Sequence, residues 1–263
     1  MHLVYCFLFI LYNLRMSLLV IANWKANPKT ITQAKKLAKA VHTYLTKSKK
    51  TAVLAVPAPY FAVINNLKSK RILLGAQDIS SFSSGPHTGD IPGEILSSFG
   101  VRYVIVGHSE RRALGEPHSL INQKIIRALN FNITPVVCVG ELSREHLDRA
   151  LSFVKQQIET ALVGISRTKI TKVVIAYEPV WAISSNNGRQ ATPEECKEMI
   201  VYIRKTIADI YGQTIAKQMR ILYGGSVSGK KDATDFAKNG GAQGFLVGRA
   251  SLDPKSFDAI VSL

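Results

Sequence analysis

Hydrophobic and polar positions fall into two alternating patterns from Ser17 to the end of the chain. One pattern is a short run with aliphatic or β-branched side chains on both faces, typical of a parallel strand covered on both sides. Eight such runs occur, at residues 18–23, 52–57, 72–77, 102–108, 135–140, 172–178, 220–225 and 244–249.

The other pattern is a longer amphipathic segment with helical periodicity, found after each run. These segments are residues 31–45, 60–67, 93–99, 120–130, 144–162, 193–211, 229–239 and 254–263. One helix start is well marked, because Thr192 offers a capping hydroxyl and Pro193 and Glu195 suit the first turn.

The repeated strand–helix rhythm fits both an open, doubly wound sheet and a closed barrel. No charged linker or change of composition divides the chain. Because eight units in one domain of this length favour closure, we predict an α/β fold with a single (β/α)8 barrel domain over residues 16–263.

Residues 1–15 are almost entirely apolar and precede a second methionine, Met16. The segment is shorter than the roughly 20 residues of a spanning helix, and it lacks the basic region and cleavage site of a signal peptide. We therefore expect an extension outside the barrel, explained more simply by a start assigned too early at Met1 than by a membrane anchor.

The composition is that of a soluble globular protein, with 46% hydrophobic and 20% charged residues. The cysteines Cys6, Cys138 and Cys196 are odd in number and scattered. They form neither a disulfide framework nor a metal-binding spacing, so we expect a cytoplasmic protein.

The charge balance is unusual, because 34 Lys and Arg face 18 Asp and Glu, a net charge of +16. Such a balance indicates an anionic partner. The densest basic runs, residues 47–50 and 68–71, are interpreted mainly as solvated helix ends and loops. Nucleic-acid binding is the less favoured alternative, and it would weaken steeply with salt.

In a (β/α)8 barrel the chemistry lies where the strands end, so the residues after each run are the candidates. Taken singly, a lysine, a histidine or a glutamate there has an ordinary structural explanation. Their convergence on one mouth, beside glycine-rich turns whose main-chain N–H groups suit a phosphate, favours a catalytic site. The candidates are Asn23, Lys25, His108, Ser109, Glu110, Glu178, Gly224, Gly225, Ser226, Gly248 and Arg249.

Taken together, these segments resemble the triosephosphate isomerase family. Its motifs occur in the family's order from about Met16 onward: ANWK, TGD, VGHSERR, CVGE, AYEPVWAI, YGGSV and GFLVGRASL. The resemblance implies a TIM barrel that interconverts dihydroxyacetone phosphate and D-glyceraldehyde 3-phosphate through an enediolate, in glycolysis and gluconeogenesis, without cofactor or metal.

The resemblance also implies residue roles. Glu178 would be the base and His108 the neutral electrophile, while Lys25 and Asn23 would bind substrate and stabilise oxyanion charge. Glu110, next to Ser109, would pair with Lys25. The phosphate ligands would be Ser226, Gly248 and the backbone of Arg249.

This chain departs from the family pattern at three places. Arg249 stands where most relatives have a second glycine, and its side chain either points outward, which we favour, or approaches the phosphate. In the dimer loop Asp90 replaces a glutamate, while Thr88 would still reach the partner, so we expect a homodimer. In the family, the loop after the base Glu178 closes over the site as a lid. Here the tip of this loop is two residues longer, and Ser184 stands where a glycine usually offers its N–H to the phosphate.

Competing functions remain open at this point. Another phosphate-binding barrel, a phosphoribosyl isomerase or an aldolase, is one; an aldolase would need a Schiff-base lysine or a metal site, and neither is indicated. A barrel with impaired turnover that acts as a basic scaffold or nucleic-acid binder is the other. The set Asn23, Lys25, His108 and Glu178 argues against it.

Overall fold

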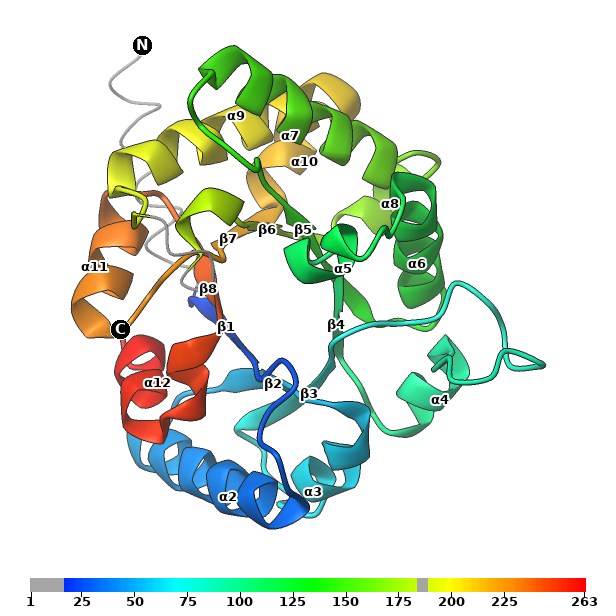
Figure 1. Ribbon diagram of the computed structural model, residues 1–263, viewed down its shortest axis with the longest axis vertical. Helices are drawn as coiled ribbons and strands as arrows, with labels where there is room; N and C mark the ends of the chain where they lie inside the picture. Colours follow the sequence, from blue (N-terminus) through cyan, green and yellow to red (C-terminus); the bar gives the residue numbers. More distant parts are fainter. Residues whose placement is uncertain (1–16, 184–188) are drawn as a thin grey trace.

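The computed structural model describes residues 17–183 and 189–263, which form a closed barrel of parallel strands surrounded by helices (Figure 1). The strands are β1 (Leu19–Asn23), β2 (Ala52–Ala55), β3 (Ile72–Ala76), β4 (Tyr103–Val106), β5 (Thr134–Val139), β6 (Val174–Tyr177), β7 (Arg220–Tyr223) and β8 (Gly244–Val247). Their order in the barrel is their order in the chain, and β1 pairs with both β2 and β8. The predicted (β/α)8 barrel is therefore confirmed, and the open sheet is excluded.

Alternation along each strand creates two separate apolar layers. In β1, Leu19 and Ile21 belong to the cluster inside the barrel, whereas Val20 and Ala22 belong to the cluster between the sheet and the helices. Successive side chains of a strand point to opposite faces, so a strand in a filled barrel must be apolar on both. This requirement explains why the sequence shows continuous apolar runs rather than alternating ones.

The helices form a ring outside the strands (Figure 1). They are α2 (Ile31–Ser48), α3 (Phe61–Asn65), α4 (Gly93–Ser98), α5 (Ser109–Ala113), α6 (His118–Asn130), α7 (Leu147–Ala161), α8 (Arg167–Ile170), α9 (Pro193–Tyr211), α10 (Gln213–Gln218), α11 (Lys230–Lys238) and α12 (Pro254–Val261). Three 3-10 turns, η1 (Ala58–Tyr60), η2 (Val180–Ala182) and η3 (Arg249–Leu252), follow β2, β6 and β8.

The start of α9 is as predicted, with the Thr192 hydroxyl accepting from the Glu195 N–H and the Glu195 carboxylate accepting from the Thr192 N–H. The expected start of α7 at residue 144 was wrong, because the helix begins at Leu147 and the Arg144 guanidinium instead contacts carboxylates near the barrel mouth. The short helices α8 and α10 were not predicted.

Within residues 17–183 and 189–263, no helix is both long enough and apolar enough to cross a bilayer. Over the same ranges, no group of three or more His, Cys, Asp or Glu side chains is placed to hold a metal ion.

Candidate active site

A cavity of about 870 Å³ opens where the strands end. Because the strands are parallel, the segments after β1, β4, β6, β7 and β8 all reach it. Among the candidates from the sequence it is lined by Asn23, Lys25, His108, Glu110, Glu178, Gly224, Gly225, Ser226, Gly248 and Arg249. Ser109 is not among the lining residues but donates to Glu178, and Ser184 falls outside the described residues.

Glu178 follows β6 and is buried, with only 3% of its side chain exposed. Its Oε1 lies 3.2 Å from His108 Nε2, and its Oε2 accepts from the Ser109 N–H at 3.2 Å. Two glycines leave room for it: a Cβ on Gly224 would lie 2.8 Å from Glu178 Cγ, and one on Gly140 would lie 1.8 Å from the Glu178 carbonyl oxygen. Glu178 is therefore fixed by backbone close packing as well as by the Ser109 N–H and the contact with His108.

His108 is the N-cap of α5, and its Nδ1 accepts from the Glu110 N–H at 3.2 Å. An accepting nitrogen carries no proton, so in this arrangement the ring is neutral with its hydrogen on Nε2. Nε2 lies on the side of Glu178, 3.2 Å from its Oε1, and borders the cavity. The imidazole is thus placed to donate through Nε2 to a bound molecule.

Lys25 has a left-handed backbone, with φ of 51°. Such a φ is costly for a residue with a Cβ, and here two hydrogen bonds hold it: the Lys25 N–H donates to Asn23 Oδ1 at 3.0 Å, and Gln77 Nε2 donates to the Lys25 carbonyl at 2.8 Å. The amine pairs with Glu110 Oε1 at 2.7 Å, as expected from the resemblance. Lys25 Cε would lie 3.6 Å from a Cβ on Gly248, so the amine stands beside the turn after β8.

The expected phosphate ligands Ser226, Gly248 and Arg249 line the cavity after β7 and β8. Ser226 connects both flanks of the lid, because its hydroxyl donates to the Ala182 carbonyl at 2.9 Å and its carbonyl accepts from Gln190 Nε2 at 2.9 Å. Arg249 starts η3 and is exposed, and it also lines the cavity.

A buried network that was not predicted from the sequence supports the segment before residues 184–188. Glu141, only 1% exposed, accepts from the Tyr177 hydroxyl at 2.9 Å, from Trp181 Nε1 at 2.9 Å and from Arg144 Nη1 at 3.3 Å. Burial, and then the Glu141 carboxylate, raise the pKa of Tyr177, so its hydroxyl stays protonated as a donor. The sequence does contain a sign of this role, because Glu141, like Glu178, stands at the end of an apolar run.

Arg189 extends this network to the other end of the lid. Its guanidinium lies 4.6 Å from the centre of the Trp181 ring and bonds to both carboxylate oxygens of Glu195. Mainly because Arg189 donates to it, the pKa of Glu195 falls to about 2.

Cys138 lies on β5 near Glu178, fully buried. Burial raises the pKa of its thiol, and the neighbouring Glu178 carboxylate raises it further. The thiol therefore stays neutral and does not serve as a nucleophile.

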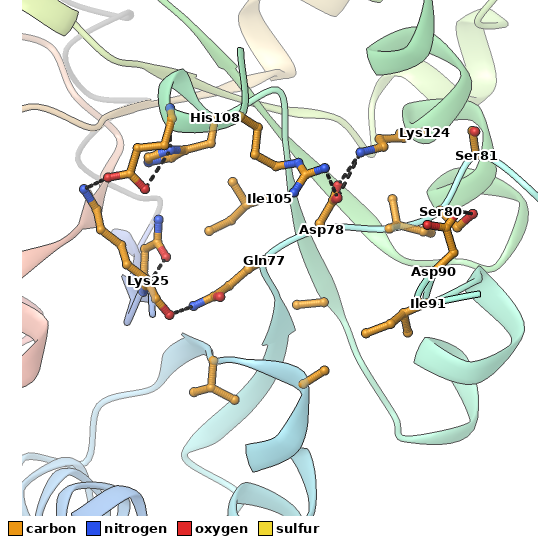
Figure 2. Close-up of a pocket in the computed structure, with 18 of the residues that line it drawn as sticks. Lys25, Gln77, Asp78, Ser80, Ser81, Asp90, Ile91, Ile105, His108 and Lys124 are labelled. Carbon is orange, nitrogen blue, oxygen red and sulfur yellow. Dashed lines mark hydrogen bonds and ion pairs between the residues drawn. The ribbon is translucent and has the colours of Figure 1, made fainter. Parts of the chain in front are cut away.

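A second cavity of about 650 Å³ adjoins the first and shares Asn23, Lys25 and His108 with it. Figure 2 shows Lys25 and His108 at one end, and Asp78, Lys124, Ser80 and Asp90 toward the other. Lys124 is buried and pairs with Asp78 at 2.8 Å and with Glu116. Burial raises the pKa of Asp78, although Lys124 opposes the shift.

Comparisons with known proteins agree with this geometry. A family model described as triosephosphate isomerase matches residues 18–263. The chain is 41% identical to a triosephosphate isomerase of Caldanaerobacter subterraneus subsp. tengcongensis and 40% identical to one of Clostridium botulinum (strain Okra / Type B1), with 93% of this chain and 98% of each relative covered. It is 41% identical to a triosephosphate isomerase of Herminiimonas arsenicoxydans, over 92% of this chain and 97% of the relative.

Proposed function

The chain belongs to the triosephosphate isomerase family, and from that membership we propose how its residues perform the reaction. It is an aldose–ketose isomerase that interconverts dihydroxyacetone phosphate and D-glyceraldehyde 3-phosphate. The chemistry requires a base for a carbon-bound proton next to a carbonyl, and donors for the oxygen that becomes negative. One observation carries the proposal: a buried carboxylate and a neutral imidazole donor lie 3.2 Å apart at the mouth of a cavity that also holds a lysine amine.

Glu178 removes the carbon-bound proton and returns it to the neighbouring carbon. His108, donating through Nε2, stabilises the enediolate and moves a proton between its two oxygens. Lys25 stabilises the same negative charge and attracts the phosphorylated substrate, and its left-handed backbone and pairing with Glu110 aim the amine at the cavity. Asn23 adds a hydrogen bond to substrate, and its Oδ1 also supports the Lys25 backbone.

The phosphate is bound by Ser226, by the Gly248 backbone and by the Arg249 N–H. The turn after β8 suits this role, because Gly248 brings the backbone close to Lys25. Ser184 or its neighbour supplies a further N–H when the lid closes and excludes water. The reaction needs no cofactor and no metal.

We also propose a homodimer in which the loop carrying Thr88 enters the partner's second cavity, beside Lys25 and His108. Asp90, which is shorter than the glutamate usual at this position, accepts from the Ser80 hydroxyl at 2.7 Å. This hydrogen bond joins the two ends of the loop. The protein acts in the cytoplasm, and its barrel domain spans residues 16–263.

The test is a coupled assay with glyceraldehyde 3-phosphate on the wild type and on Glu178→Asp. Shortening the side chain moves the carboxylate by about 1 Å, and a misplacement of that size costs roughly 10²-fold in rate, so kcat should fall by about that factor with KM little changed. Glu194→Asp, at an exposed glutamate of α9, is the matched control and should retain full activity. An inactive wild type, or an unchanged kcat in Glu178→Asp, would refute the mechanism.

A further inference from the structure

We propose that the end of the barrel opposite the active site docks on an anionic lipid bilayer. This amino-end face consists of the segments that lead from a helix into the next strand, including α8 and α10. They are residues 49–51, 66–71, 99–102, 131–133, 162–173, 212–219 and 239–243. Because the strands are parallel around a closed barrel, all these segments lie at the end where the strands begin.

Every charged side chain in these segments is a lysine or an arginine: Lys49, Lys50, Lys68, Lys70, Arg71, Arg102, Arg167, Lys169, Lys172 and Lys217. The segments at the active-site end mix both signs, as in the pairs of Lys25 with Glu110 and of Arg111 with Asp78. Most of the positive net charge is therefore gathered at one end of the molecule.

Most of these cations are available to a partner, because they are exposed and form no salt bridge among the described residues. The exceptions are Lys50, which donates to an oxygen of Leu263 at 2.9 Å, and Arg71, which donates to the Lys49 carbonyl at 2.9 Å. Lys169 and Lys172 donate to the side-chain oxygens of Asn130 and Asn132 at 2.8 and 3.3 Å. These bonds place the two ammonium groups beside residues 131–133, the segment before β5, which contains no charged side chain.

The surroundings of the cations favour a bilayer over a nucleic acid. Single-stranded nucleic acid is usually held in a groove with stacking aromatic side chains, and neither cavity described above is lined by these segments. Val163 and Phe99 stand among the cations with 63% and 39% of their surface exposed. At a bilayer, apolar side chains can enter the headgroup region while neighbouring lysines contact anionic headgroups.

The start of β1 also lies at the amino-end face. Leu19 begins β1 at the same face, where its N–H donates to the Gln243 carbonyl at 3.3 Å. The cations lie between residues 49 and 217, within the part of the chain that the structure describes.

The test measures co-sedimentation of the full chain with phosphatidylcholine vesicles, with and without phosphatidylserine. Binding should require phosphatidylserine and should weaken as NaCl is raised, because salt screens exposed charges. Bound enzyme should keep its kcat, since docking by this face leaves the active-site mouth toward solution. Binding that ignores phosphatidylserine, or that abolishes turnover, would contradict the proposal.

Two triple variants with the same change of net charge locate the surface. Lys70→Glu, Arg102→Glu and Lys172→Glu together should weaken vesicle binding at least about tenfold, whereas Lys35→Glu, Lys39→Glu and Lys197→Glu, at exposed lysines of α2 and α9, should change it less than about twofold. Both should retain isomerase activity in solution, which shows that they fold. Equal losses in the two variants would overturn the proposal, as would tighter binding of a single-stranded oligonucleotide than of the anionic vesicles.

Discussion

At the scale of single residues, the position of Glu178 depends on two neighbouring glycines, which have no Cβ atom. Gly224 has no Cβ where Glu178 Cγ needs space, and Gly140 has none where the Glu178 carbonyl passes. Neither glycine has a φ in the left-handed region, so both are required for room rather than for backbone freedom.

We expect Gly224→Ala to lower kcat by roughly ten- to a hundredfold, because its Cβ would lie 2.8 Å from Glu178 Cγ and one of the two groups must move. The measurement is steady-state kinetics with glyceraldehyde 3-phosphate. Gly229→Ala is the control, because a Cβ there meets nothing within 4 Å. A normal kcat in Gly224→Ala would show that Glu178 is held by its hydrogen bonds alone.

At the scale of elements, η2 and the start of α9, which lie on either side of residues 184–188, are joined by side-chain contacts of their own. Trp181, in η2, donates to Glu141, and Arg189 stacks on Trp181 while it binds Glu195 in the first turn of α9. One arginine therefore connects the segment before residues 184–188 with the helix after them.

Arg189→Gln should reduce kcat/KM several-fold, because the lid would lose a contact that fixes both of its ends. Lys197→Gln, at an exposed lysine of α9, serves as the control and should leave kcat/KM unchanged. The assay is the same coupled reaction. If both variants match the wild type, Arg189 is a surface residue without influence on the lid.

The ion pair of Arg189 with Glu195 should also make the stability of the protein depend on pH. The pKa of Glu195 falls from 4.5 to about 2 on folding, mainly through Arg189, so the stabilisation is complete above 4.5 and is lost as the pH falls toward 2. The difference in Tm between the wild type and Arg189→Gln should accordingly be constant at neutral pH and shrink on acidification below about 4.5. A difference that grows in acid would contradict this assignment.

At the scale of the whole molecule, the second cavity beside Lys25 and His108 offers a place for a loop of another copy. Thr88→Arg should shift the protein to a monomer and lower kcat/KM by at least about tenfold, because a bulky cation would block the entry of the loop. Analytical ultracentrifugation with a parallel assay measures both effects. Thr32→Arg, at an exposed threonine of α2, is the control, and a fully active monomer would refute the dimer proposal.

The sequence predicted the barrel and the meeting of the candidate residues, because parallel strands that close into a ring must place all their ends together. It could not predict contacts that depend on side-chain conformation across long separations. Lys124 meets Asp78 over 46 residues, and Trp181 meets Glu141 over 40. The short helices α8 and α10 were missed because each lies between a predicted helix and the next strand and shows no separate helical periodicity.

The closure of the barrel through β1 and β8 also governs how the enzyme is made. Until β8 leaves the ribosome, β1 has one unpaired edge, and a chain halted before Gly244 would leave edges of β1 and β7 open to aggregation. Lys25 is synthesised early and Gly248 almost last. The complete site therefore requires the whole barrel, since Lys25 and Gly248 meet only when β8 has paired with β1.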